Sequence, residues 1–309
     1  MAKSIRYILK AFQEPFGGPL QIRRHVKALA ESGFDARMVT DSLSDNHFYD
    51  LPVPTLLRSD FNPTQSDICV IPEGWRKEFE ELGKSGATLI CLWQNHFYVY
   101  LGFKRKETFA TFGIGTVICC SRQVANHVER YYGVPDVQVI PCGIEMPPEV
   151  PRHKELAISF MPRKAPYEAG FIKDVFHRCY PELDGVEWIA IDGQSHSEAM
   201  RRLGRTALFL SLAHREGFGL PPIEAMSLRT LVVGFHGGGG LEYATSRNGY
   251  WLNEGELIQC AQELSPCLEM IRRGTREISD KLDQGQLTAS YFDVSRMKTR
   301  LIEFWEGRV

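Results

Sequence analysis

The chain has 309 residues, a formal net charge of −2, and 43% hydrophobic and 24% charged residues. This composition is typical of a soluble globular protein, and the length favours two domains of about 150 residues. The near-neutral charge argues against nucleic acid as a partner. The longest apolar runs are far shorter than the about 20 residues that a membrane-spanning helix requires.

The eight cysteines are scattered along the chain and show neither a Cys-x-x-Cys pair nor the spacing of zinc ligands. No segment of the sequence has the pattern of a signal peptide. We therefore expect free, buried thiols and a cytoplasmic location, because the cytosol keeps thiols reduced.

The first half of the chain alternates between strands and helices. A helix over residues 20–32 is predicted to open at Pro19 and to end at Gly33, and Ser121 is predicted to cap a later helix that ends at Gly133. Apolar runs predict strands over residues 4–9, 36–40, 67–71, 88–92, 116–120 and 137–140. Such alternation predicts a parallel sheet covered by helices on both faces.

The segment 141–151 interrupts this alternation. Five of its eleven residues are proline or glycine, which fit neither regular element, so we expect the interdomain linker here. Alternation resumes with strands predicted over residues 156–161, 188–191, 207–211 and 231–234. The last segment carries apolar residues at helical spacing, namely Met297, Leu301, Ile302 and Trp305. We thus expect two similar α/β domains, 1–145 and 152–287, and a final helix within 288–309.

One nine-residue run carries most of the functional information: from Glu216 to Glu224 the chain reads Glu-Gly-Phe-Gly-Leu-Pro-Pro-Ile-Glu. It joins a predicted strand to a helix that opens at Pro221. The glycines let the backbone approach a ligand, and the first amides of a helix attract phosphate. Carboxylates repel phosphate, so they suit sugar hydroxyls instead. Phosphate at the loop and hydroxyls at its flanks together describe a nucleotide-sugar.

The residue types of this run, taken alone, also fit solvated surface charges and ordinary turn glycines. In its context, however, the run resembles the E-x(7)-E motif of retaining glycosyltransferases with the GT-B fold, which include sucrose synthases and bacterial mannosyl- and glucosyltransferases. About forty residues match in order and spacing, through residues 224–226, 230–233, 237–242 and 248–252. The resemblance implies an α/β GT-B fold of two Rossmann-like domains, with parallel sheets that face each other across a cleft and a last helix that crosses back to the first domain.

The resemblance also implies roles within the run. Glu216 is expected to be catalytic and to contact the hydroxyls of the reacting sugar, and Glu224 is expected to bind the ribose. The other residues expected to bind the donor are Gly217, Phe218, Gly219 and Leu220. A double displacement would need a nucleophile, and the sequence identifies none. The resemblance favours same-face attack, with the leaving phosphate as base.

A basic pair follows the first predicted strand of the second domain. Arg163 offers a fork for phosphate oxygens and Lys164 a mobile point charge, so both are candidates for binding the diphosphate. Family members carry an arginine here and a lysine some residues later, whereas this pair is adjacent and follows Met161-Pro162 instead of a glycine. The position of the second positive charge therefore stays open, as does the alternative of a solvated pair at a strand end.

Two further candidates lie after predicted strands of the first domain. Gly18 is expected to present amides to the phosphates, although a tight turn with positive φ explains a glycine equally well. His96 follows the strand over residues 88–92, at the end where open α/β sheets bind ligands. The family places a histidine of this domain near the donor sugar, which makes His96 the second catalytic candidate. Asn95 and His214 are alternatives for that contact.

Neither a metal nor another cofactor is expected, because no Asp-x-Asp pair stands near a strand end. The expected partners are a nucleotide-sugar donor and a glycan or lipid-linked acceptor. Basic residues on two predicted helices fit either a solvated face or peripheral contact with anionic lipid: Arg23, Arg24 and Lys27 on one, and Arg201, Arg202 and Arg205 on the other.

These observations predict a cytoplasmic, metal-independent, retaining hexosyltransferase that moves a sugar from a nucleotide diphosphate to an acceptor hydroxyl. Two competitors remain: a nucleotide-sugar epimerase or a phosphorylase on the same fold, and a noncatalytic protein that only binds nucleotide-sugars. An epimerase would convert the donor without any acceptor, and donor hydrolysis would count against the noncatalytic protein.

Overall fold

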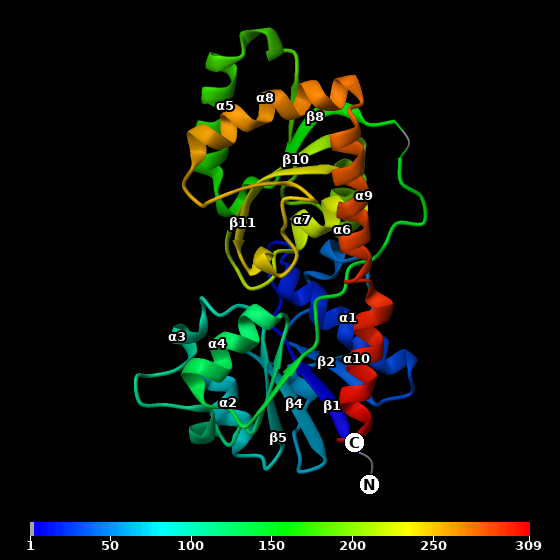
Figure 1. Ribbon diagram of the computed structural model, residues 1–309. Coiled ribbons are helices and arrows are strands. Elements are labelled where there is room, and N and C mark those ends of the chain that lie inside the picture. Colours follow the sequence, from blue (N-terminus) through cyan, green and yellow to red (C-terminus); the bar gives the residue numbers. More distant parts are fainter. Residues whose placement is uncertain (1–2, 152) are drawn as a thin grey trace. The chain divides into compact units, whose positions relative to one another are not determined.

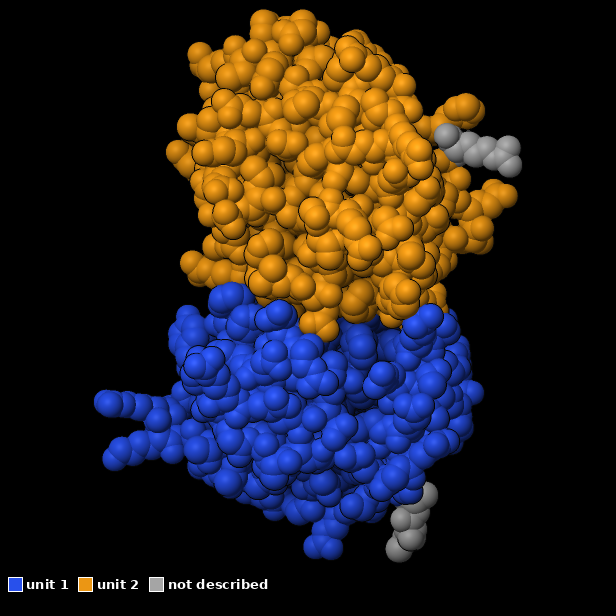
Figure 2. Space-filling view, in the orientation of Figure 1, with its two compact units in different colours: residues 1–143, 294–309 blue, residues 144–293 orange. Residues whose placement is uncertain are grey.

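The computed structural model describes residues 3–151 and 153–309 (Figure 1). Residue 152, where the second domain is predicted to begin, lies outside the described residues. The chain forms two compact units, coloured separately in Figure 2. Unit 1 comprises Met1–Gly143 together with Val294–Val309, and unit 2 comprises Ile144–Asp293.

Unit 1 is built on a seven-stranded, wholly parallel sheet with strand order β3-β2-β1-β4-β5-β6-β7. Helices cover both of its faces (Figure 1). The strands are β1 (Ser4–Ile8), β2 (Ala36–Thr40), β3 (Thr55–Leu57), β4 (Asp67–Pro72), β5 (Thr88–Trp93), β6 (Thr116–Cys119) and β7 (Asp136–Val139), and the helices are α1 (Gly17–Glu31), α2 (Arg76–Gly83), α3 (Val99–Gly102), α4 (Arg122–Tyr132) and α10 (Val294–Glu306). Because both faces are covered, the central strands are nearly continuous apolar runs, which is why the sequence predicted them.

Helix α1 differs from its prediction in two ways. It begins at Gly17, directly after the extended Phe16, so Gly18 lies in the first helical turn and not in a loop. It is also buried on both sides, because α10 packs on the same core cluster through Met297, Leu301, Phe304 and Trp305. The predicted solvated or lipid-facing basic stretch is therefore wrong for Arg23 and Arg24, which are 2% and 3% exposed.

Unit 2 is built on a five-stranded parallel sheet with strand order β12-β11-β10-β8-β9. Its strands are β8 (Glu155–Phe160), β9 (Glu187–Ala190), β10 (Thr206–Glu216), β11 (Leu231–Gly238) and β12 (Tyr250–Leu252), and its helices are α5 (Pro166–Cys179), α6 (His196–Arg205), α7 (Leu220–Ser227), α8 (Leu257–Arg273) and α9 (Arg276–Ser290). An apolar core cluster joins α5 and α8 to the sheet. Strands β10 and β11 run beyond their predicted ends, because their ladder continues past an irregularity between Ala213 and Glu216.

The chain passes from unit 1 to unit 2 at Gly143, and side chains of α1 hold this residue. The Gly143 N–H donates to Gln21 Oε1 at 2.9 Å, and its carbonyl accepts from Gln21 Nε2 at 2.9 Å and from an Arg24 guanidinium nitrogen at 2.6 Å. A Cβ at this position would lie 3.1 Å from Val294 Cα and from Met297 Cβ. Close packing against α10 thus favours glycine here.

The eight cysteines are free thiols, and seven of them are buried, as the sequence predicted. The prediction of burial is wrong for Cys179, which is exposed. In the described part of the chain, no helix combines the length and the apolar character that crossing a membrane requires.

Candidate active site

The carboxyl ends of β8 and β10 bring two predicted site residues together in unit 2. These strands are neighbours in the sheet, and a short 3-10 turn (Pro162–Lys164) follows β8 while Glu216 ends β10. Lys164 Nζ lies 2.6 Å from Glu216 Oε1. A half-exposed pair of this kind contributes little to stability. The pair is therefore informative about function through its position at the carboxyl ends of two neighbouring strands.

Arg163 lies in the same short turn and is half-buried. The adjacent basic residues thus diverge in environment: Lys164 contacts Glu216, whereas Arg163 is more enclosed.

Two glycine loops of unit 2 pack backbone against backbone beside this pair. A Cβ on Gly239 would lie 2.4–2.5 Å from backbone atoms of Gly217, Glu216 and Phe218. Gly219 has φ +83°, and its carbonyl accepts a hydrogen bond from the Tyr243 hydroxyl at 2.5 Å. Both loops therefore need glycine, and they fix each other's position.

Phe218 anchors the loop that contains Gly217 and Gly219. Its side chain is 3% exposed and packs edge-on against Tyr243 and Phe292, with ring centroids 5.4 and 5.1 Å away. A side chain buried in this way supports the loop, so only the backbone of Phe218 stays a candidate for contact with a ligand.

Helix α7 has fewer backbone N–H groups in its first turn than a helix N-terminus usually offers to a phosphate. It begins at Leu220, and its second and third residues are Pro221 and Pro222, which have no N–H. The amide donors expected to face a phosphate are thereby limited to Gly219, Leu220 and, one turn further, Ile223.

Glu224 lies within α7 and is 5% exposed. Its Oε1 is 2.9 Å from Nε2 of His196, the first residue of α6, whose preceding Ser195 caps the helix by accepting from the Glu198 N–H. Sequence reasoning did not select His196. The signal was present, because Ser195-x-x-Glu198 is a capping pattern that places residue 196 at a helix start just after a strand.

The matching edge of unit 1 is organised by a carboxylate that sequence reasoning also missed. Glu73 follows β4, and its two oxygens accept the backbone N–H groups of Gln94 and Asn95 at 3.0 and 2.7 Å. Burial raises the pKa of Glu73 to about 7, against the opposing effect of these amides. Gln94 Nε2 donates to the Gly18 carbonyl at 3.0 Å, so Glu73, Gln94 and Gly18 form one cluster.

His96 lies next to this cluster and is half-buried. Its ring centroid is 4.2 Å from that of Phe97 and 5.2 Å from that of His127. Burial, assisted by His127, lowers the pKa of His96, so the imidazole is neutral near pH 7. Its Nδ1 has no hydrogen-bond partner among the described residues.

The two alternatives to His96 have other partners. Asn95 is 7% exposed, and its Oδ1 accepts the Phe97 N–H at 2.9 Å. His214 Nδ1 lies 2.6 Å from Glu254 Oε2, with 46% of the histidine side chain exposed. His96 and Glu216 belong to different units, and their action on one ligand stays a prediction.

The remaining basic residues make structural pairs. Arg23 lies 2.9 Å from Asp45 with both side chains at most 2% exposed. On α6, Arg201 and Arg202 pair with Glu198, and Arg205 pairs with Glu155, at exposed positions. The solvated alternative thus describes α6 well, and Lys27 is the exposed member of the α1 stretch.

Solved structures share the fold of the whole chain. The glycosyltransferase from Rickettsia africae ESF-5 superposes with a TM-score of 0.71 at 13% identity, covering 99% of this chain and 98% of that one. Anabaena Alr3699/HepE, solved in complex with UDP and glucose, gives a TM-score of 0.72 at 13% identity, covering 99% and 100%.

Sequence comparisons point to the same class. Residues 185–270, which contain the Glu216–Glu224 run, match the family model "Glycosyl transferases group 1". An alpha-1,6-glucosyltransferase of Actinobacillus pleuropneumoniae serotype 7 (strain AP76) is 25% identical over 280 residues, which cover 87% of this chain and 84% of that protein. The chain is a glycosyltransferase with the GT-B fold. The predicted α/β fold class is confirmed, and this GT-B glycosyltransferase carries its group 1 match on unit 2.

Proposed function

We propose that this protein is a retaining glucosyltransferase that uses UDP-glucose and acts on a hydroxyl of a glycan or lipid-linked acceptor. The observation that carries the proposal is the Lys164–Glu216 pair at neighbouring strand ends, framed by the two glycine loops. Glucose as the sugar is supported by the name of the Actinobacillus relative, an alpha-1,6-glucosyltransferase. UDP is supported by the Anabaena structures in complex with UDP, with UDP and glucose, and with UDP-glucose.

In the proposed donor complex the Lys164–Glu216 pair exchanges partners. The ammonium of Lys164 moves onto a diphosphate oxygen, because phosphate carries more charge than one carboxylate. Glu216 is then released to accept hydrogen bonds from two sugar hydroxyls. The pair thus keeps both charges compensated in the absence of donor, and each finds a new partner when donor binds.

The proposed transfer proceeds on one face of the sugar. The bond between the anomeric carbon and the β-phosphate oxygen breaks while the acceptor oxygen bonds to that carbon, and the acceptor proton passes to the leaving diphosphate. Arg163 and Lys164 stabilise the charge that develops on the diphosphate, a role that a metal ion fills in other enzymes. We therefore propose that no metal is required.

The first test follows UDP-glucose by proton NMR, with and without a saccharide acceptor and with EDTA. The proposal expects UDP release, an α-configured product and full activity in EDTA. A β-configured product would exclude retention. Conversion of UDP-glucose to another UDP-sugar without acceptor would indicate an epimerase, and UDP binding without any turnover would indicate a noncatalytic protein.

The second test separates the basic pair by thermal shift with UDP and with uridine. Arg163→Ala and Lys164→Ala should both weaken UDP binding far more than uridine binding, because their proposed partners are phosphate oxygens. Equal losses for the two ligands would contradict the phosphate role. If only Arg163→Ala has an effect, Lys164 serves Glu216 alone.

A further inference from the structure

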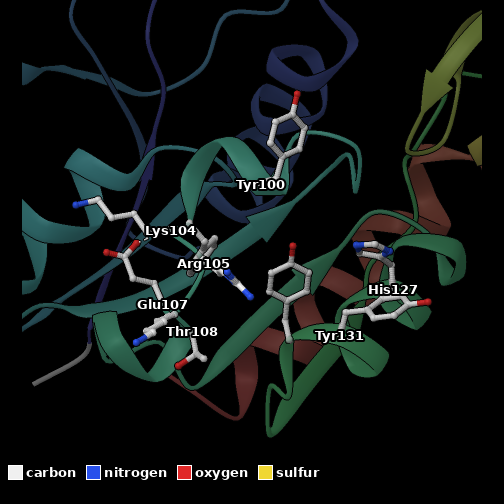
Figure 3. A pocket seen from close by; sticks show the side chains of 10 residues that line it. Tyr100, Lys104, Arg105, Glu107, Thr108, His127 and Tyr131 are labelled. Atoms are coloured by element: carbon white, nitrogen blue, oxygen red, sulfur yellow. Dashed lines mark hydrogen bonds between the residues drawn. The ribbon is translucent and has the colours of Figure 1, made fainter.

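A hollow in unit 1 lies beside His96 and plays no part in the donor-site argument. Its walls come from residues 100–108, which follow β5, and from helix α4 (Figure 3). The cavity has a volume of about 530 Å³. This volume is within the range of small-molecule binding sites.

The hollow has an aromatic floor and an aromatic rim. Phe103 and Tyr132 line it from a ring cluster that includes Phe109, whose centroid lies 5.0 Å from that of Phe103. On the rim, Tyr100 and Tyr131 are 72% and 63% exposed. Exposed rings over a packed aromatic base are suited to the apolar faces of sugar rings, because the base holds the site rigid while the rims stay accessible.

A row of rings connects the hollow to His96. His127 lines the hollow, and its ring centroid lies 5.0 Å from that of Tyr131 and 5.2 Å from that of His96. Burial lowers the pKa of His127 as it does that of His96. Both imidazoles are therefore neutral near pH 7, and a ligand in this hollow would lie next to the residue expected to contact the donor sugar.

The rim carries an excess of positive charge. The carboxylate that lines the hollow, Glu107, is neutralised by Arg76, whose Nε and a terminal nitrogen lie 3.0 and 2.5 Å from its oxygens. This pairing lowers the pKa of Glu107 to about 2. Three other cations line the hollow, namely Lys104, Arg105 and Lys106. Lys104 acts on Glu107 through its charge, whereas Arg105 and Lys106 make no ion pair with any described residue of the chain and remain for an anionic ligand.

We propose that this hollow is the acceptor subsite and that it takes an acidic saccharide. The exposed rings of Tyr100 and Tyr131 contact sugar rings of the saccharide, and its carboxylate or phosphate binds Arg105 and Lys106. The inference rests on the proposed glucosyl transfer and adds to it the chemical class of the acceptor.

The experiment compares three acceptors: maltose, its analogue with a terminal uronic acid, and its phosphomonoester. Binding is measured by calorimetry in the presence of UDP, so that the result does not depend on turnover, and kcat/KM is measured with UDP-glucose. Wild type should prefer an acidic acceptor by about tenfold or more, and the R105A/K106A double variant should bring the preference near one. The two acidic arms show whether carboxylate or phosphate is the ligand.

A matched control removes two exposed lysines of unit 1 outside the hollow, Lys77 and Lys84. The K77A/K84A variant should keep the acid preference, which excludes a general effect of net charge. Tyr131→Ala should weaken every acceptor several-fold, whereas Tyr131→Phe keeps the ring and should bind like wild type.

Several outcomes would overturn the inference. The first is equal binding of neutral and acidic acceptors by wild type, and the second is an unchanged acid preference in R105A/K106A. The third is that R105A/K106A loses binding to phosphatidylglycerol vesicles and nothing else, which would make Arg105 and Lys106 a membrane contact. Failure of the proposed function is a separate result. In that case acidic saccharides bind as described, yet UDP-glucose is not consumed with any acceptor.

Discussion

Helix α1 in unit 1 and helix α5 in unit 2 each follow the first strand of their sheet. They have the same place in the topology, but they bury different kinds of residue. Helix α1 buries Gln21, Arg23, Arg24 and His25 besides its apolar residues, whereas the buried residues of α5 are Ala169, Ile172 and Phe176. The cause is α10, which shares the core cluster of α1 and encloses its outer side. A helix enclosed on both sides needs internal partners for its polar residues, and Asp45, Gly143 and Tyr7 supply a partner each to Arg23, Arg24 and His25.

The carboxyl edges of the two sheets differ as well. In unit 2 the edge is set by backbone contact between glycine loops and by ion pairs. In unit 1 it is set by side chains, with Glu73 holding two amides and Gln94 reaching Gly18. The carboxyl edge of the sheet in unit 2 should therefore tolerate almost no change, whereas that of unit 1 should adapt to substitutions.

Glycine-to-alanine substitutions test this contrast most strongly. Gly239→Ala would place a methyl group 2.4–2.5 Å from three backbone atoms, so we expect a loss of about 3 kcal/mol or more in stability and loss of UDP binding. Gly18→Ala meets only the end of the Gln94 side chain, at 2.9 Å, and should cost about 1 kcal/mol or less. Chemical denaturation and calorimetry measure both effects.

Gly170→Ala is the matched control, because it lies in α5 with nothing within 4 Å of the added methyl group. It should be neutral or stabilise by up to about 1 kcal/mol through helix propensity. If Gly239→Ala behaves like Gly170→Ala, backbone contact between the glycine loops does not fix the carboxyl edge of unit 2 as described.

The buried polar interior of unit 1 predicts a specific acid sensitivity. Burial lowers the pKa of His25 from 6.5 to about 4. Between pH 6.5 and 4 the unfolded chain binds a proton at His25 that the folded chain does not bind. The contribution of the neutral His25 to the free energy of unfolding is therefore complete above pH 6.5 and is lost as the pH falls toward 4. The lost free energy of unfolding amounts to about 3 kcal/mol.

Urea denaturation from pH 4 to 7.5 measures this effect as the difference between wild type and His25→Gln. The difference should grow as the pH rises toward 6.5 and then stay constant. Parallel pH profiles for the two proteins would show that His25 titrates as in the unfolded chain, and that α1 is less enclosed than described.

In unit 2, Glu216→Gln and Glu224→Gln should each lose most transferase activity while the protein stays folded. A charged hydrogen bond to substrate is worth about 1.5–3 kcal/mol, which corresponds to a fall of about 10- to 150-fold in kcat/KM. Glu254→Gln is the control, because Glu254 also pairs with a histidine, His214, but at an exposed position. Parent-like turnover by both variants would refute the donor-site assignment.

The smallest effect is expected from His96→Ala in unit 1. A neutral hydrogen bond contributes about 0.5–1.5 kcal/mol, so transfer should fall several-fold to about tenfold. UDP affinity should change less, because the proposed contact is with the sugar. His214→Ala should be silent in both assays, and an equal loss of transfer and UDP affinity in His96→Ala would assign His96 a structural role instead.

The sequence predicted much of the fold because most strands are buried on both faces and read as apolar runs. It missed β3, a three-residue edge strand whose residues are partly exposed. It misjudged the start of α1 because Phe16 supplies no side-chain cap, and it misjudged Arg23 and Arg24 because α10, which encloses them, is about 270 residues away in the chain.

The candidate site divides in the same way. The Glu216–Glu224 loop could be selected from the sequence because its glycines, prolines and carboxylates are contiguous, and its role in binding the donor stays a prediction. Glu73, His127 and His196 were not, because each matters through a partner that lies 21 to 31 residues away in the sequence, such as Glu224 for His196. A local pattern cannot show which distant residue will lie beside it.

The packing of Gly143 against Val294 has a consequence for the engineering of the chain. Since a Cβ on Gly143 would lie 3.1 Å from Val294 Cα, the two ends left by excising residues 144–293 are already neighbours. Unit 2 is thus a continuous insert within a discontinuous host. A short linker from Gly143 to Val294 would close unit 1 as one polypeptide, and the same two junctions are natural places to graft the corresponding unit of another protein with this fold.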